Sequence, residues 1–213
     1  MTDGAELPER ARALLDFWFG PSGDPDREKH REIWFRSTVE FDDALCREFF
    51  ADYEAAAAGK LEAWEASPEG ALALLLLLDQ VPRNIFRDLP RTYATDPAAR
   101  VVADRALARG FDQMVAPAWR LFFYMPFHHS EDLSDQRRAA ALAAALPRNR
   151  DRRGSLRRYG RPYVEIIERF GRFPHRNAIL GRQSTPEEVA FMAEHEQRKN
   201  QQFNPSPPPT NDS

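Results

Sequence analysis

Helix start and stop signals recur along the chain, and they constrain its fold more than any other feature. Proline occupies the first helical position after four residues of the types that cap helix N-termini, Asp24, Ser67, Asp96 and Thr185. Between these signals, apolar residues recur every three or four positions, and no segment alternates in the manner of a strand. The sequence therefore predicts an all-α protein of about eight or nine helices in a single domain.

Further signals place individual helix ends. We expect a helix over 24–35, a capping box formed by Ser37 and Glu40, a short helix from Pro117, and a helix over 133–146 that Ser130 caps. Gly171 is expected to end another helix in a left-handed conformation. The helical domain is expected to span 1–199. Residues 200–213 are polar and rich in proline, which predicts a disordered tail.

Composition excludes several classes of protein. The net charge of −3 argues against a protein dominated by electrostatic attraction to nucleic acid. The longest apolar run, 71–78, is far shorter than the roughly 20 residues that cross a bilayer, so no membrane span is expected. The single cysteine, Cys46, and an N-terminus without the pattern of a signal peptide indicate a cytoplasmic protein. No cofactor, metal or oligomeric state is assigned.

The segment 163–182 concentrates polar residues beside an aromatic-rich helix end. Arg172, His175, Arg176 and Asn177 follow Gly171 on irregular backbone around a proline. Loops held by a rigid scaffold commonly display binding side chains. We therefore interpret these four residues as candidates for ligand binding.

A second polar cluster follows the buried apolar run. Asp79 terminates the run, and Pro82 predicts a bend just after it. An acid in such a place needs a charged or hydrogen-bonding partner, and Arg83 and Asn84 are the nearest in sequence. The pairing could serve a site or could simply hold the bend.

A third cluster contains His128, His129, Glu131 and Asp132. Their spacing could hold a divalent metal if the segment were helical, whereas the simpler interpretation is a capped helix start with acidic residues in its first turn. The arginine-rich segment 146–161 could contact RNA, but it lacks the interleaved aromatic residues of single-strand recognition. A solvated loop is the expected structure, and nucleic-acid binding is not expected.

Three motifs in order resemble the bacterial family catalogued as domain of unknown function 924. They are LALLLLLDQVPRNIFR with the later ATDPAA, FFYMPFHHSEDLSDQ, and IIERFGRFPHRNAILGR. The resemblance spans roughly residues 11–194 and implies a tetratricopeptide-like array of helical hairpins, without implying an activity. The chain departs from the family at 163–165, which reads Tyr-Val-Glu where members have a histidine, a basic residue and an aspartate. A role for that histidine is therefore absent here.

Three functions remain open at this stage. The first is binding of a small anionic ligand or acidic peptide in a groove lined by Arg83, Asn84, Arg87, His128, Arg172, His175, Arg176 and Asn177. The second is a hydrolase whose catalytic candidates are Asp79, His128 and His175. The third is a protein-interaction scaffold in which the same charges form an internal ion network. Contact between an acid and a histidine would favour catalysis, and fully paired charges would favour a scaffold.

Overall fold

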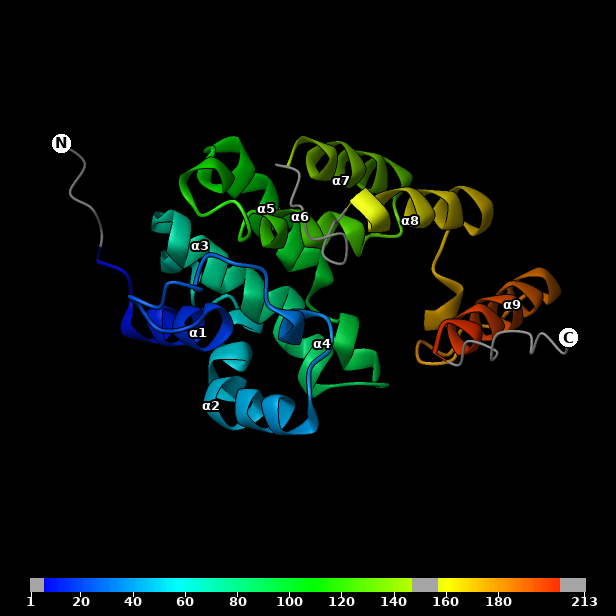
Figure 1. Cartoon of the computed structure of the whole chain (residues 1–213), viewed down its shortest axis with the longest axis horizontal. Helices are drawn as coiled ribbons and strands as arrows, with labels where there is room; N and C mark the ends of the chain where they lie inside the picture. Colours follow the sequence, from blue (N-terminus) through cyan, green and yellow to red (C-terminus); the bar gives the residue numbers. More distant parts are fainter. Residues whose placement is uncertain (1–5, 147–156, 204–213) are drawn as a thin grey trace, which may run out of the picture.

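The computed structural model describes residues 6–146 and 157–203, which form helices joined by turns and contain no strand (Figure 1). The helices are α1 (Glu9–Phe19), α2 (Val39–Ala57), α3 (Pro68–Leu75), α4 (Val81–Ile85), α5 (Asp96–Ala108), α6 (Leu121–His128), α7 (Leu133–Ala145), α8 (Arg157–Phe170) and α9 (Pro186–Phe203). The expected all-α, single-domain fold is confirmed for this part of the chain. The tetratricopeptide-like arrangement stays a prediction.

The segment from α3 to α4 lies at the centre of the fold. α3 packs against α1, α5 and α6, while α4 packs against α2. Every residue of the run 72–78 is at most 3% exposed. Because this run has no polar face, it is stable only with neighbours on all sides. One π-helical turn, η3 (Leu76–Gln80), joins α3 to α4.

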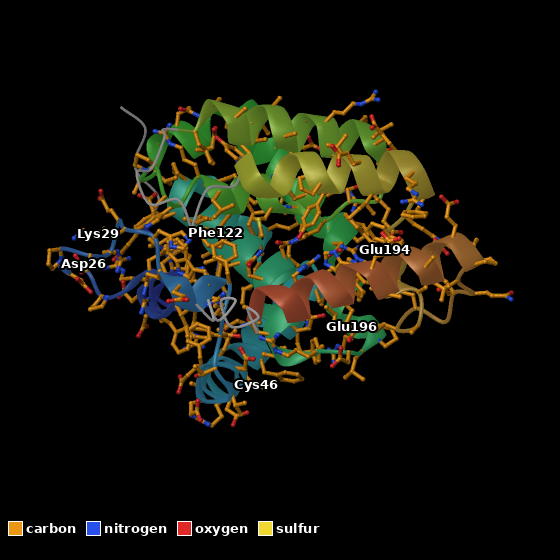
Figure 2. All side chains as sticks on the ribbon, turned by 45° about the vertical axis from the view of Figure 1, so that its right-hand side comes forward. Asp26, Lys29, Cys46, Phe122, Glu194 and Glu196 are labelled. Carbon is orange, nitrogen blue, oxygen red and sulfur yellow. The ribbon has the colours of Figure 1, made fainter. Side chains whose placement is uncertain are left out.

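Aromatic side chains fill the core beside α1 and α6. The ring centroid of Phe122 lies 5.9 Å from that of Trp18, 5.5 Å from Phe19 and 5.1 Å from Trp34, each pair in an edge-to-face arrangement. Such contacts add to the large apolar area that the rings bury. Figure 2 shows Phe122 within the body of the molecule, whereas Asp26 and Lys29 lie at its edge.

The C-terminal helices extend this body in one direction. α7 packs against α6 and α8, and α7 and α8 run side by side (Figure 1). α9 packs against η6 (Pro174–Arg176), a short 3₁₀ turn in the connection after α8. The connection 171–185 links α8 to α9. It contains Arg172, His175, Arg176 and Asn177, the four binding candidates of the third motif.

Two expected features near the N-terminus are wrong. The segment 24–35 is not an α-helix: it forms turns and a short 3₁₀ helix over 32–34. The Asp24 side chain accepts a hydrogen bond from the amide of Asp26 at 2.8 Å, which favours a turn over a helix N-cap. The cap of α2 is Thr38, not Ser37, since Thr38 Oγ1 accepts from the amide of Phe41.

Later boundaries agree more closely. Ser67 caps α3, Thr185 and Glu188 form the expected reciprocal box at α9, and Gly171 has a φ of +67° after α8. α6 begins at Leu121 rather than Pro117, and Asp132 caps α7 in place of Ser130. Asp132 is better placed because its carboxylate accepts from the amides of the first helical turn. α9 extends to Phe203, so residues 200–203 are helical where the sequence predicts a disordered tail. The rest of that tail, 204–213, and most of the arginine-rich segment lie outside the described residues.

Candidate functional site

Pro82 shapes the backbone that carries Asp79. Proline has no N–H to donate, so the carbonyl of Leu78 loses its helical partner. Thr95 Oγ1 donates to that carbonyl at 2.6 Å, and Arg83 Nη1 donates to the carbonyl of Asp79 at 2.6 Å. The π-helical turn η3 ends at Gln80, just before the proline, so the irregular hydrogen bonding lies on both sides of Asp79. The bend is thereby stabilised, and it holds Asp79 at the polar end of the apolar run.

Asp79 is buried, 1% exposed, and its carboxylate is surrounded by donors. His129 Nδ1 lies 2.8 and 3.0 Å from its two oxygens, Gln80 Nε2 donates to Oδ2 at 2.5 Å, and Arg83 Nη1 lies 3.3 Å from Oδ1. Burial by itself would raise the pKa of Asp79, but the charge of Arg83 and the contacts with His129 and Gln80 outweigh it and lower the pKa. The carboxylate is therefore ionised, and it is shielded and engaged with an arginine, as the sequence predicts.

Two arginines approach a second buried carboxylate, that of Asp96. Arg83 Nη1 and Nη2 each lie 2.9 Å from one of its oxygens, whereas Arg176 Nη1 lies 3.7 Å away. The guanidinium carbon of Arg176 is 4.4 Å from the ring centroid of Tyr93 and 4.6 Å from that of Phe173. Aromatic rings at this distance stabilise a cation. Arg176 is thus held by aromatic rings more than by acids.

The guanidinium of Arg176 is incompletely satisfied. Its residue is 6% exposed, its Nε is buried without a hydrogen-bond partner, and its side chain donates no hydrogen bond to any residue that the structure describes. Burial is the main reason that its pKa is lowered, partly offset by Asp96. Asp79 and Asp96 balance Arg83 and Arg176 in number, but the shorter contacts of both acids are made with Arg83. Arg176 therefore makes the weakest ion pair of the cluster, and the charge of Glu131 acts on it in the same direction as Asp96.

His129 presents its second nitrogen away from Asp79. The backbone around it is fixed by Gln136, whose Nε2 donates to the carbonyls of His128 at 2.7 Å and Ser130 at 2.6 Å. The His129 side chain is 14% exposed, and Nε2 has no hydrogen bond to a described residue. Burial and the charge of Arg83 together hold the pKa of His129 below its usual value. The imidazole is therefore neutral near pH 7.

His128, the candidate named from sequence, has a different environment. It is 1% exposed, and both ring nitrogens are buried without a hydrogen-bond partner. Its ring packs edge-on against Tyr163, with centroids 6.3 Å apart. Burial lowers its pKa to about 4, assisted by the neighbouring His129. The acid–histidine contact of this region is therefore made by His129, which the sequence indicated only as a possible metal ligand.

The other candidates in 171–185 belong to a separate ion network. Arg172 Nε and Nη2 donate to the two carboxylate oxygens of Glu188 at 2.7 and 2.9 Å, and Asn177 Nδ2 donates to the same carboxylate at 3.1 Å. Arg182 forms an equivalent two-bond pair with Glu131 and also donates to Asn177 Oδ1. These groups are engaged with one another, and they join α9 to the connection before it.

Arg87 and Asn84 lie in a third environment, against α2. Asn84 Nδ2 donates to Asp42 at 2.7 Å, and Arg87 Nε donates to the other oxygen of Asp42 at 2.9 Å. His175 is exposed, with its ring centroid 5.4 Å from that of Phe173. The structure thus brings together Asp79, Arg83 and Arg176 from the predicted set, and it places Arg87 and Asn84 in separate contacts.

Three members of the central cluster were not singled out as site residues from sequence. From sequence, Asp96 is predicted to start a helix, Tyr93 lies in no motif, and His129 is a candidate only for metal binding. The available signal was the burial of Asp79, which demands a partner but does not say which one.

In the described ranges, no three metal-binding side chains gather, and no helix is long and apolar enough to cross a membrane.

An all-helical protein with a buried cluster of aspartate, histidine and arginine is the class that this fold and site define. The model of the family described as bacterial protein of unknown function (DUF924) matches residues 14–196, so the chain belongs to this family. A solved structure of a protein of unknown function from Agrobacterium tumefaciens, ATU0120, is 42% identical, with a TM-score of 0.76. The match covers 86% of this chain and 97% of that chain. No curated protein matches the chain.

Proposed function

We propose that the protein binds a small ligand through a phosphate or carboxylate group at Arg176, in the cluster that also contains Arg83 and His129. The observation that carries the proposal is the buried Nε of Arg176, which has no hydrogen-bond partner. Buried polar groups are satisfied in the great majority of proteins, and a planar guanidinium matches the oxygens of carboxylates and phosphates. An anion would supply the partner that Asp96, at 3.7 Å, supplies only weakly.

The surroundings of Arg176 support this assignment. Tyr93 and Phe173 cover the guanidinium and fix its position, so little side-chain entropy remains to be lost on binding. Arg83 and His129 are 18% and 14% exposed in their side chains, which gives the cluster contact with solvent. The proposal is narrower than the groove expected from sequence, because Arg172 and Asn177 already bind Glu188.

The scaffold interpretation applies best to that second network. Arg172, Asn177 and Arg182 are engaged with Glu188 and Glu131, and these contacts connect α9 to the rest of the chain. Internal ion pairs of this kind maintain a structure without binding a ligand. We therefore assign the network a role in holding α9 and reserve ligand binding for Arg176.

Thermal unfolding in phosphate and in small dicarboxylates tests the proposal. A ligand of the native state raises the melting temperature, and above Kd the increase follows the logarithm of the ligand concentration. Arg176→Gln should weaken that ligand by about 10- to 150-fold, the effect of losing a charge-assisted hydrogen bond of about 1.5–3 kcal/mol. Arg169→Gln is the matched control, since Arg169 is 51% exposed and pairs with Glu187. Equal loss in the two variants, or stabilisation by none of these anions, would contradict the proposal.

A further inference from the structure

The Asp79–His129 pair leaves a proton acceptor in the cluster that contains the proposed anion site, linked to Arg176 through Arg83 and Asp96. Because Asp79 is ionised and 2.8 Å from Nδ1, the ring proton lies on Nδ1 and the lone pair lies on Nε2. Nε2 has no hydrogen bond to a described residue, and the His129 side chain is 14% exposed. A neutral imidazole oriented by a carboxylate is the arrangement that enzymes use most often to remove a proton.

The pair is held rigidly from both sides. Gln80 fixes the second oxygen of Asp79 at 2.5 Å, and Gln136 fixes the backbone on either side of His129. Arg83 Nη1 lies 3.3 Å from the same carboxylate. Because Arg83 belongs to α4, its positive charge has a fixed position relative to the Asp79–His129 pair. Fixed charges of this kind stabilise negative charge that develops in a transition state.

We infer that the Asp79–His129 pair is a general base that activates water against the carbonyl carbon of an ester or thioester bearing an anionic group. The inference rests on the proposed function, since Arg176 would bind the anionic group. His129 is the catalytic residue, because it touches the water, and Asp79 is a positioning residue that acts through it. Among the described residues, no serine, threonine or cysteine side chain is hydrogen-bonded to His129, so water is the nucleophile.

The reaction balances with water as the only co-reactant. The water oxygen bonds to the carbonyl carbon while one of its protons passes to His129 Nε2, and the carbonyl oxygen becomes an oxyanion, whose charge Arg83, the cation that acts on His129, would offset. The tetrahedral intermediate then expels the alkoxide or thiolate, which takes the proton from Nε2. The products are a carboxylic acid and an alcohol or thiol, and His129 returns to its neutral state.

Hydrolysis of two activated esters tests this reaction. The probes are p-nitrophenyl hydrogen succinate, which carries a carboxylate, and the neutral p-nitrophenyl acetate. We expect preference for the anionic ester, a loss of kcat/KM of at least about 100-fold in His129→Gln, and no loss in the control His195→Gln, which changes an exposed histidine of α9. Absence of His129-dependent ester hydrolysis overturns the inference, and so does cleavage of p-nitrophenyl phosphate in place of the esters.

A second measurement reports on the base without a substrate. Diethyl pyrocarbonate modifies neutral, accessible imidazole nitrogens, and peptide mapping should find His129 modified rapidly in the wild type and slowly in Asp79→Asn. Phosphate should still raise the melting temperature of Asp79→Asn and of His129→Gln. Adding Arg176→Gln to either variant should remove that increase. If anion binding persists while His129 is unreactive, the inference fails and the proposed function stands. If no anion binds, the proposed function is wrong. In that case, any ester hydrolysis by the protein should show no preference for the anionic probe.

Discussion

Thr95 donates a 2.6 Å hydrogen bond to the carbonyl of Leu78, the group that Pro82 leaves without a helical partner. The bond joins the residue before α5 to the bend between α3 and α4. It also brings Asp96, the next residue, to the side of the bend where Arg83 lies. The central cluster therefore depends on how the chain compensates for one proline.

Removing that bond should destabilise the fold. Thr95→Val keeps the shape of the side chain but leaves the Leu78 carbonyl buried and unpaired, which costs about 1–3 kcal/mol. Urea denaturation of the two proteins measures the difference in the free energy of unfolding. Thr95→Ser retains the hydroxyl and should lose less. A loss in Thr95→Ser with none in Thr95→Val would show that the methyl group, and not the hydrogen bond, is responsible.

Asp79→Ala should lower the free energy of unfolding by about 3–5 kcal/mol, because it leaves the charge of Arg83 and the donors of Gln80 and His129 without their buried partner. Asp104→Ala provides the comparison. Asp104 is 53% exposed and pairs with Arg138 at the surface, so its loss should cost less than about 1 kcal/mol. A loss at Asp79 no larger than that at Asp104 would mean that the carboxylate is hydrated.

The stability of the protein should fall as the pH drops from 6.5 towards 4, in part because of His128. Above its ordinary pKa of 6.5, this histidine is neutral in the folded and unfolded chains. Below 6.5 the unfolded chain takes up a proton, while burial lowers the pKa in the folded protein to about 4. The loss from this group is on the order of 3 kcal/mol at full effect.

His128→Leu should remove this part of the pH dependence. The measurement is the free energy of unfolding at several pH values, compared between the variant and the wild type. The difference between them should change between pH 6.5 and 4 and stay constant above pH 7. His195→Leu, on the exposed face of α9, should follow the wild type. A constant difference for His128→Leu would contradict its burial as a neutral ring.

Glu188→Gln should loosen α9. Arg172, the amide of Thr185 and Asn177 all favour the charged carboxylate and lower the pKa of Glu188 to about 2. Hydrogen exchange over 186–196 should therefore be faster in this variant than in Glu187→Gln, whose side chain is 62% exposed. In the wild type the same contacts should weaken as the pH falls from the ordinary value of 4.5 through about 2. Unchanged exchange in Glu188→Gln would show that packing alone holds α9.

The local signals in the sequence determined most helix boundaries. Ser67, Thr185 and Gly171 act through hydrogen bonds and dihedral angles within a few residues, so their effects do not depend on distant parts of the chain. The prediction of a helix over 24–35 is wrong because this segment also depends on distant residues. The turn at Asp24 forms locally, but Trp34 is held in place by a hydrogen bond that its side chain donates to the carbonyl of Trp18.

The partners of the buried charges were decided only by the tertiary structure. The apolar run predicts that Asp79 is buried and must be paired, because an isolated charge is costly in the core. The run does not choose among donors, since the energy of a charge pair depends on distance in space. Packing of α6 against the α3–α4 segment placed His129 on Asp79 and left His128 in the apolar interior. Neighbours in sequence thus acquired different chemistry, because consecutive side chains of a helix end point in different directions.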